Sequence, residues 1–130
     1  MATIFTKIIK GEIPSYKIFE NEHVFAFLDI KPIQIGHALI VSKIEVDYFA
    51  NLPEPYYSAI FQAALPIAKA IHKATKCERV GTAIVGFEVP HVHYHLIPMW
   101  DPSDLDFRKG KTHKDADMKN MQQKILACLD

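Results

Sequence analysis

Two spacings of apolar residues occur in the first third of the chain and predict a short helix followed by strands. The apolar positions of residues 4–9 recur every three or four residues and stop near Gly11, which predicts a short amphipathic helix. Apolar runs at residues 16–19, 24–28 and 38–41 are bounded by turn-forming residues, so each predicts a strand. The second of these runs is apolar throughout and is expected to be buried.

The rest of the chain predicts two further helices and two further strands. Residues 53 to about 76 carry an apolar stripe at helical spacing and predict a long helix, in which Pro66 should cause a kink or loosen a turn. Apolar runs at residues 80–85 and about 91–99 predict two strands, which the short segment between them should join as a hairpin. Apolar residues recurring from Met118 to Leu129 predict a C-terminal helix.

This order of elements predicts an α+β fold: a five-stranded antiparallel sheet with a long helix, short flanking helices and an added C-terminal helix. We expect a single domain over residues 1–130, with its core at about residues 3–100 and a C-terminal extension at residues 101–130. The extension begins with a polar, loop-like stretch, and its helix packs either on this domain or on a partner subunit. The segment from Trp100 to Phe107 either reaches a partner's pocket or packs beside the core.

Composition and charge exclude several classes of protein. The 15 basic residues balance the 15 acidic residues, which argues against a general nucleic-acid or membrane-surface binder. Cys77 and Cys128 form no Cys-x-x-Cys pair, so a reduced, cytoplasmic protein is expected. The N-terminus shows no signal peptide, and no apolar run approaches the ~20 residues that span a bilayer.

Three histidines at alternate positions, His91, His93 and His95, lie within an apolar run. On a strand all three side chains would point to one face, with the intervening side chains turned toward a core. A core seldom takes three imidazoles in a row, because each ring brings nitrogens that need partners. Two interpretations remain: His93 attacks an electrophile while its neighbours hold anionic oxygens, or the three rings bind zinc.

Two further residues are candidates for the same site. His37 begins a predicted strand, where it is either an exposed histidine or a group that fixes the orientation of a nucleophilic imidazole. Asp29 ends a buried strand, where it either caps a turn or accepts hydrogen bonds from a sugar diol.

Three separated segments resemble the histidine triad (HIT) family. Residues 91–97 match its H-φ-H-φ-H-φ-φ signature, in which φ is an apolar residue. Residues 4–14 resemble the opening of the nucleotide-binding, Hint-like branch, and residues 25–41 are similar to the family's middle segment. The resemblance covers about residues 4–98, and it implies the same five-stranded antiparallel fold.

The resemblance also implies an activity and its residues. Family members are homodimers that bind purine nucleotides and cleave AMP or GMP conjugates at a phosphoramidate or phosphoanhydride bond, through a nucleotidyl-histidine intermediate and without a metal or cofactor. By motif position, His93 would attack the α-phosphorus, His91 and His95 would support the site, and His37 would orient the catalytic imidazole. The residues implied in nucleotide binding, with Asp29 on the ribose and His95 near the phosphate oxygens, are Ile4, Phe5, Ile8, Phe27, Asp29, Glu88, Val89 and His95.

The loop before the triad departs from the family pattern. Hint-like proteins carry Asn, Gln and Ser side chains there, whereas residues 83–90 have none and form a shorter loop. Pro90 also restricts Val89 to an extended backbone. Glu88 either places negative charge near an anionic substrate or points away from it. We therefore expect altered specificity or slow turnover, and two alternatives stay open: a weakly catalytic or non-catalytic purine-nucleotide-binding protein, and a zinc-dependent hydrolase.

Overall fold

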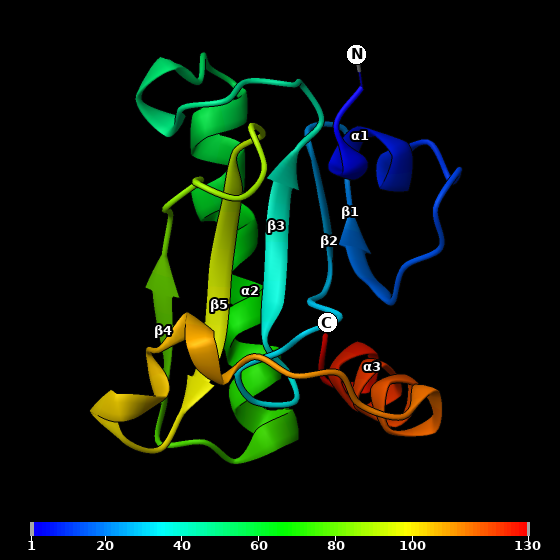
Figure 1. The fold of residues 1–130 in the computed structure, drawn as a ribbon, viewed down its shortest axis with the longest axis vertical. Coiled ribbons are helices and arrows are strands. Elements are labelled where there is room, and N and C mark those ends of the chain that lie inside the picture. Colours follow the sequence, from blue (N-terminus) through cyan, green and yellow to red (C-terminus); the bar gives the residue numbers. More distant parts are fainter. Residues whose placement is uncertain (1, 130) are drawn as a thin grey trace.

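A five-stranded antiparallel sheet in the order β1-β2-β3-β5-β4 organises residues 2–129, which the computed structural model describes (Figure 1). It confirms the predicted α+β architecture. In chain order the elements are α1 (Ile4–Ile9), β1 (Lys17–Glu20), β2 (Val24–Leu28), β3 (Ala38–Ser42), the 3-10 turn η1 (Phe49–Asn51), α2 (Tyr56–Thr75), β4 (Arg79–Ala83), β5 (His93–Met99), the 3-10 turns η2 (Pro102–Asp104) and η3 (Phe107–Lys109), and α3 (Asp115–Cys128).

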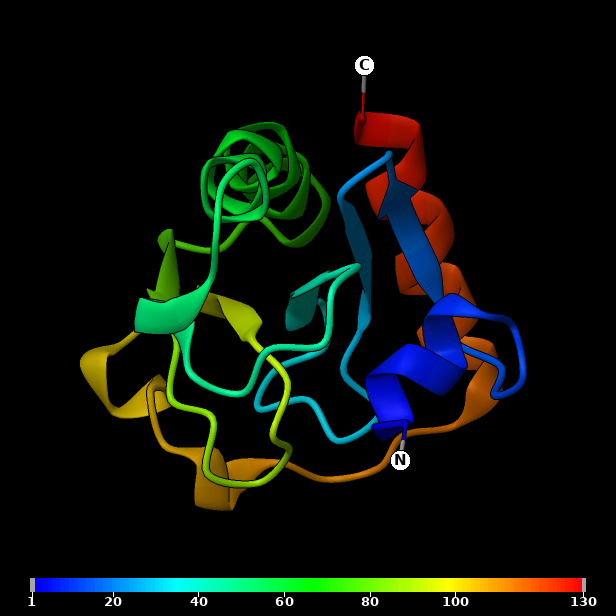
Figure 2. The ribbon, with the colours of Figure 1, turned by 90° about the horizontal axis from the view of Figure 1, so that it is seen from above.

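The two faces of the sheet are covered by different parts of the chain. Helix α2 lies along one face, whereas α1 and the segment after β5 lie on the other (Figure 2). Because side chains alternate along a strand, β2 and β3 bury both of their faces, and all ten of their residues are buried. The residues turned toward α2 are Val24, Ala26, Leu28, Ala38 and Ile40, and those packed with α1 are Phe25, Phe27, Leu39 and Val41.

Strand β5 follows the same alternation and confirms the predicted separation of its side chains. Val92, Tyr94 and Leu96 join the core under α2. The histidines at the alternate positions therefore lie on the α1 face. The ring of Phe5 in α1 packs 5.0 Å from His93, measured between centroids.

The structure corrects the predicted start of this strand. His91 precedes β5, because its N–H donates to the carbonyl of Val89 (2.8 Å) rather than to a neighbouring strand. Proline at position 90 favours this turn, since it keeps the preceding residue extended. Strand β4 also ends earlier than predicted, at Ala83, which pairs with His95. The stretch predicted as loop-like contains the turns η2 and η3.

Helix α2 runs without a break through Pro66, at which the sequence predicts a kink or a loosened turn. A proline ring cannot donate to the carbonyl four residues earlier, here that of Gln62. Both residues lie on the exposed side of the helix, where water can replace the missing donor. Within residues 2–129, no helix combines the length and apolar character needed to cross a membrane.

Helix α3 packs on this chain and so resolves the alternatives left by its apolar stripe. Met118 and Ile125 are buried in the core with α2 and β1. At the helix start, the hydroxyl of Tyr16 donates to Asp115 at 2.5 Å. Further along, Gln122 Nε2 donates to the carbonyl of Lys17 at 2.8 Å.

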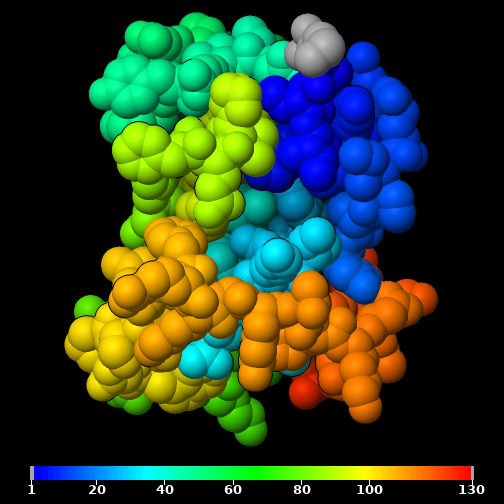
Figure 3. Space-filling model, in the orientation of Figure 1, coloured from blue at the N-terminus to red at the C-terminus, as the bar shows by residue number. Residues whose placement is uncertain are grey.

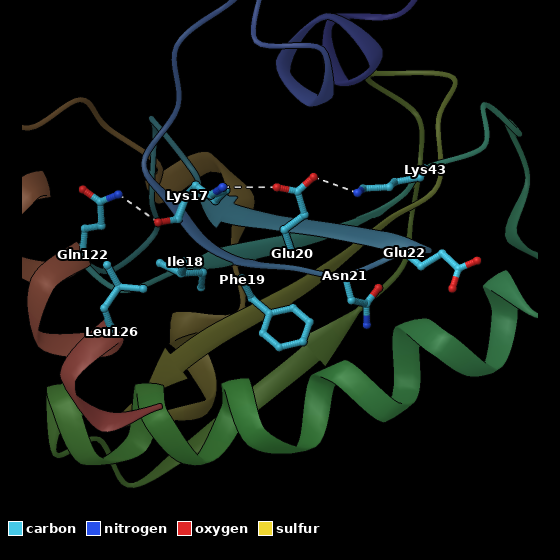
Figure 4. Close-up of a pocket in the computed structure, with 9 residues that line it drawn as sticks. All are labelled: Lys17, Ile18, Phe19, Glu20, Asn21, Glu22, Lys43, Gln122 and Leu126. Atoms are coloured by element: carbon cyan, nitrogen blue, oxygen red, sulfur yellow. Dashed lines mark hydrogen bonds and ion pairs between the residues drawn. The ribbon is translucent and has the colours of Figure 1, made fainter. Parts of the chain in front are cut away.

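A shallow depression marks the joint between β1 and α3 (Figure 4). Its floor carries an ion-pair network in which Lys17 Nζ and Lys43 Nζ lie 3.1 and 2.7 Å from the two oxygens of Glu20. Hydrogen bonds from Lys43 and then Lys17 hold the pKa of Glu20 below its ordinary value. Lys17, Glu20 and Lys43 are therefore paired with one another, and the Lys43–Glu20 pair joins β1 to the residue that follows β3.

The packing of α3 predicts unequal costs for two neighbouring truncations. Ile125→Ala should lower the free energy of unfolding by about 2–4 kcal/mol, because it leaves a cavity in the core. Leu126→Ala, at a side chain 39% exposed, should cost less than about 1 kcal/mol. Urea denaturation of both variants measures the difference, and equal costs would contradict the packing described.

Candidate functional site

A cavity of about 330 Å³ opens on the α1 face of the sheet. In the space-filling view a hollow separates the N-terminal helix and the loop before β5 from the segment after it (Figure 3). Ten of the eleven residues proposed from the sequence line this cavity, and His91 is the exception. The lining residues are Ile4, Phe5, Ile8, Ile13, Pro14, Ser15, Phe27, Asp29, Ile30, Lys31, Ile33, His37, Leu39, Glu88, Val89, His93, His95, Phe107 and Gly110.

One end of the cavity is apolar and aromatic. Phe5 and Phe27 pack at a centroid distance of 5.7 Å, and Phe5 reaches across to His93. Helix α1 presents Phe5 because Thr3 caps its N-terminus, with Thr3 Oγ1 accepting from the N–H of Thr6 at 3.2 Å. This end can hold a flat, apolar group next to the histidines.

The other end carries two histidines in direct contact. The N–H of Ile33 donates to His37 Nδ1 at 3.1 Å, so a neutral His37 holds its proton on Nε2. That nitrogen lies 2.9 Å from His95 Nδ1 and donates to it. The proton of a neutral His95 is consequently on Nε2. The N–H of Ile33 thus determines, through His37, which nitrogen of His95 carries the proton.

Both rings of this pair are neutral at pH 7. Burial lowers the pKa of His37 to about 4. Burial, followed by the proximity of His37 and His93, lowers the pKa of His95 to about 3. Asp29 Oδ2 lies 3.7 Å from His37 Nε2, and its Oδ1 accepts from the N–H of Lys31 at 2.9 Å. His95 can therefore donate one hydrogen bond into the cavity without carrying charge.

The tautomer of His93 is set from the opposite side. Its Nδ1 donates to the carbonyl of His91 at 2.7 Å, so a neutral His93 keeps an unprotonated Nε2. An imidazole held in this way has a lone pair at a fixed position, which is what a nucleophile or a general base requires.

His91 lies behind the cavity and has a partner at each ring nitrogen. Its Nε2 donates to the carbonyl of Ser42 at 2.7 Å, and its Nδ1 accepts from Thr3 Oγ1 at 2.7 Å. Burial is the main cause that lowers its pKa. Since Glu45 accepts from the N–H of Thr3 at 2.8 Å, this network also anchors the start of α1. His91 thus connects the helix wall to the strand.

The arrangement does not form a three-histidine metal site, because both ring nitrogens of His91 are occupied by protein groups. Asp29, His37 and His95 bring ligand atoms within 4.8 Å of one another. Yet the proton on His37 Nε2 lies between the two rings and makes a hydrogen bond there. A cation at this point would have to displace both the proton and the hydrogen bond.

Sequence reasoning missed nine of the lining residues, and only some of them left a signal. Leu39 could have been found, because it lies two positions from His37 on the same face of β3. Phe107 and Gly110 come from a polar stretch without periodicity, so no pattern identifies them. The remaining missed residues are Ile13, Pro14, Ser15, Ile30, Lys31 and Ile33.

Comparisons with known proteins agree on one family. The HIT domain model matches residues 10–101. An adenosine 5'-monophosphoramidase, HNT1, of Saccharomyces cerevisiae is 40% identical, over 88% of this chain and 80% of that protein. Its counterpart of the same name in Candida albicans is 37% identical, over 85% and 86%. A crystal structure of a HIT-like protein from Bartonella henselae matches with a TM-score of 0.87 at 27% identity, covering 98% of this chain and 96% of that one.

The buried neutral histidines predict a loss of stability in mild acid. Unfolded histidine takes up a proton near pH 6.5, whereas His37 and His95 resist protonation down to about 4 and about 3. The unfolded state then binds more protons. Stability is therefore full above pH 6.5 and falls as the pH drops, by up to roughly 1.4 kcal/mol per pH unit for each histidine.

Urea denaturation between pH 7 and pH 5 measures this slope. His95→Gln should reduce it by about one histidine's share. The control His72→Gln, at an exposed position of α2, should leave it unchanged. A slope that is the same in all three proteins would show that His95 is not buried in the neutral form.

Proposed function

The chain belongs to the histidine triad (HIT) family, and on that premise we propose that it is a nucleoside phosphoramidase using a nucleotidyl-histidine intermediate. The observation that carries this proposal is the pair of opposed tautomers: His93 keeps a free Nε2 while His95 keeps a protonated one. One nitrogen can attack phosphorus, and the other can donate to a phosphate oxygen. The related monophosphoramidases support the same reaction class.

The reaction proceeds in two displacements at the α-phosphorus. His93 Nε2 forms a bond to phosphorus while the P–N bond of the substrate breaks, and the departing amine takes up a proton. Water then attacks the same phosphorus, the bond to His93 breaks, and a nucleoside monophosphate leaves. The attacking water releases one proton to solvent, which balances the proton that the amine took from solvent in the first step. Two displacements by positioned groups replace one slow attack of water on an anionic centre. His95 Nε2–H stabilises the oxygen charge in both steps.

The two ends of the cavity suit the two ends of a nucleotide. The apolar end formed by Phe5, Phe27 and their neighbours takes the purine, with Ile4 and Ile8 as further wall residues. Asp29, 23% exposed at its side chain, accepts hydrogen bonds from the ribose hydroxyls. His37 positions His95 rather than touching the substrate, and His91 positions His93 through its carbonyl.

Glu88 and Val89 line the cavity beside these histidines, so the loop before β5 borders the phosphate position. A carboxylate there repels an anionic substrate, and the loop offers no Asn, Gln or Ser side chain. This specific feature favours a second candidate function, in which the protein binds a purine nucleotide and turns it over slowly or not at all. Lys31 at the same cavity supplies a compensating positive charge.

Turnover of adenosine 5'-phosphoramidate tests the nucleophile. His93→Gln should reduce turnover by at least roughly 10³-fold, because no other group in the cavity has a free nitrogen aimed at phosphorus. His72→Gln should retain the rate of the unchanged protein, and added chelator should have no effect. AMP affinity, measured by calorimetry, separates the two candidates. If the protein binds AMP but shows no turnover that is lost in His93→Gln, the second candidate, a nucleotide-binding protein, is favoured.

We also propose that the protein is a cytoplasmic homodimer formed through α2 and the edge strand β4. Tyr57, Phe61 and Leu65 leave 42–62% of their surface exposed on one side of α2. Phe61 also packs on Tyr94 of β5, at a centroid distance of 5.1 Å. Strand β4 ends the sheet and has an unpaired side, which a second copy can cover. The free thiols of Cys77 and Cys128 suit a reducing compartment.

Sedimentation velocity tests this assembly. Phe61→Glu should convert the dimer to a monomer, because a carboxylate would be buried at the centre of the interface. Leu126→Glu, which adds the same charge on α3, should leave the dimer intact. If the unchanged protein sediments as a monomer at micromolar concentration, the proposed assembly is wrong.

A further inference from the structure

The side chain of Phe107, in the extension after β5, contacts the histidine pair directly. Its ring meets that of His95 edge-on, at a centroid distance of 4.7 Å and an angle of 63°. It lies 6.4 Å from the ring of His37. Both Phe107 and the glycine three residues later line the same cavity as His93 and His95. Phe107 therefore belongs to this chain's own site and lies outside the part that matches the family model, residues 10–101.

The segment that carries Phe107 is fixed at its start by Asp104. This carboxylate is 8% exposed and accepts from the N–H groups of Trp100 and Asp101 at 2.8 and 3.1 Å. Its other oxygen accepts from Gln34 Nε2 at 3.0 Å, which ties the segment to the loop before β3. A carboxylate with three donors holds its surroundings in one arrangement.

The same segment is fixed at its end by a close backbone approach. A Cβ added to Gly110 would lie 2.6 Å from the carbonyl oxygen of Lys31, so no larger residue fits without movement. The N–H of Lys111 donates to the carbonyl of Pro32 at 3.3 Å. Between these two attachments, the side chain of Asp106 accepts from the N–H of Arg108 and caps the turn η3, which begins at Phe107.

We propose that Phe107 is a positioning residue for His95, and that it acts by covering the hydrogen bond between His37 and His95 against water. The proposal rests on the function given above, in which His95 donates to the phosphate. Water that entered between the rings would compete for His95 Nδ1 and release the tautomer that places a proton on Nε2. Because the segment is attached at Asp104 and at Gly110, the ring of Phe107 stays in place and keeps water from entering between the two histidines.

The electrostatic surroundings of His95 agree with this role. The ionisable groups near its ring are His37, His93 and Asp29. Burial is the largest cause that lowers the pKa of His95, His37 and His93 lower it further, and Asp29 raises it. Lys31 and Glu88 line the cavity farther along its rim. Phe107 contributes to that burial from the solvent side, where 41% of its own surface is exposed. Removing its ring should therefore expose His95 more than any other change in the extension.

The test compares Phe107→Ala and Phe107→Leu with Phe87→Ala in full-length protein labelled at the histidine rings. By NMR at pH 7, the Nδ1 and Nε2 signals of His95, assigned by their loss in His95→Gln, should be far apart in the unchanged protein, as a single tautomer requires, and should shift toward each other in Phe107→Ala as the two tautomers mix. Phe107→Leu keeps an apolar cover, so its His95 signals should stay close to those of the unchanged protein. Phe87 is 95% exposed, and its truncation should change nothing.

A second variant reaches the same contact from a different residue. Gly110→Ala should displace the segment, because its Cβ meets the Lys31 carbonyl, and should shift the two His95 nitrogen signals toward each other in the same way. Circular dichroism confirms that each variant is folded. Unchanged His95 nitrogen signals in folded Phe107→Ala would overturn the proposal, as would an equal shift in Phe87→Ala.

Turnover of adenosine 5'-phosphoramidate separates positioning from binding. In Phe107→Ala, kcat should fall roughly tenfold while KM changes less than about twofold, because the base and ribose contacts remain. A rise in KM alone would overturn the positioning role. If the unchanged protein shows no turnover, the proposed function fails, whereas the NMR measurement of the His95 tautomer still decides whether Phe107 covers His95.

Discussion

Burying imidazoles on one face of a sheet requires that each buried nitrogen has a partner, and this constraint determines how the site is built. Ile33, His91 and Thr3 each supply a donor or acceptor to one ring nitrogen. Two of these three partners are backbone groups, whose positions follow from the strands and turns that contain them. The chemistry of the exposed nitrogens is thus decided by the hydrogen bonds of the hidden ones.

The sheet makes this arrangement stable because one of its faces forms the hydrophobic core and the other carries the histidines. Strand β5 sends Leu96 and its neighbours into the core under α2, while His93 and His95 lie on the face toward α1. The hydrophobic burial under α2 stabilises the strand independently of the histidines. The histidine rings, which are costly to bury, can therefore be held in place by the packing of the opposite face, to which they do not contribute.

Alternation and helical spacing were enough to predict the sheet, the long helix and the common face of the triad, because these depend on local periodicity. The start of β5 could not be predicted in the same way, since the turn around Pro90 and the bond from His91 to Val89 override the apolar pattern. The sequence drew attention to the segment from Trp100 to Phe107 but did not place Phe107 in this chain's own cavity. Phe107 follows no repeat, and its position depends on tertiary contacts that Asp104 and Gly110 make with the loop before β3.

The hydrogen bond between Thr3 and His91 joins residues 88 positions apart in the chain. During synthesis the first helix leaves the ribosome long before His91. It can pack on β2 and β3 once they have emerged, but its contacts with His91 and His93 must wait until β5 has been made. Such long-range closure slows folding compared with local contacts. It also means that a nascent or truncated chain has no assembled cavity, so the chemistry begins only when synthesis of the strand that carries it is complete.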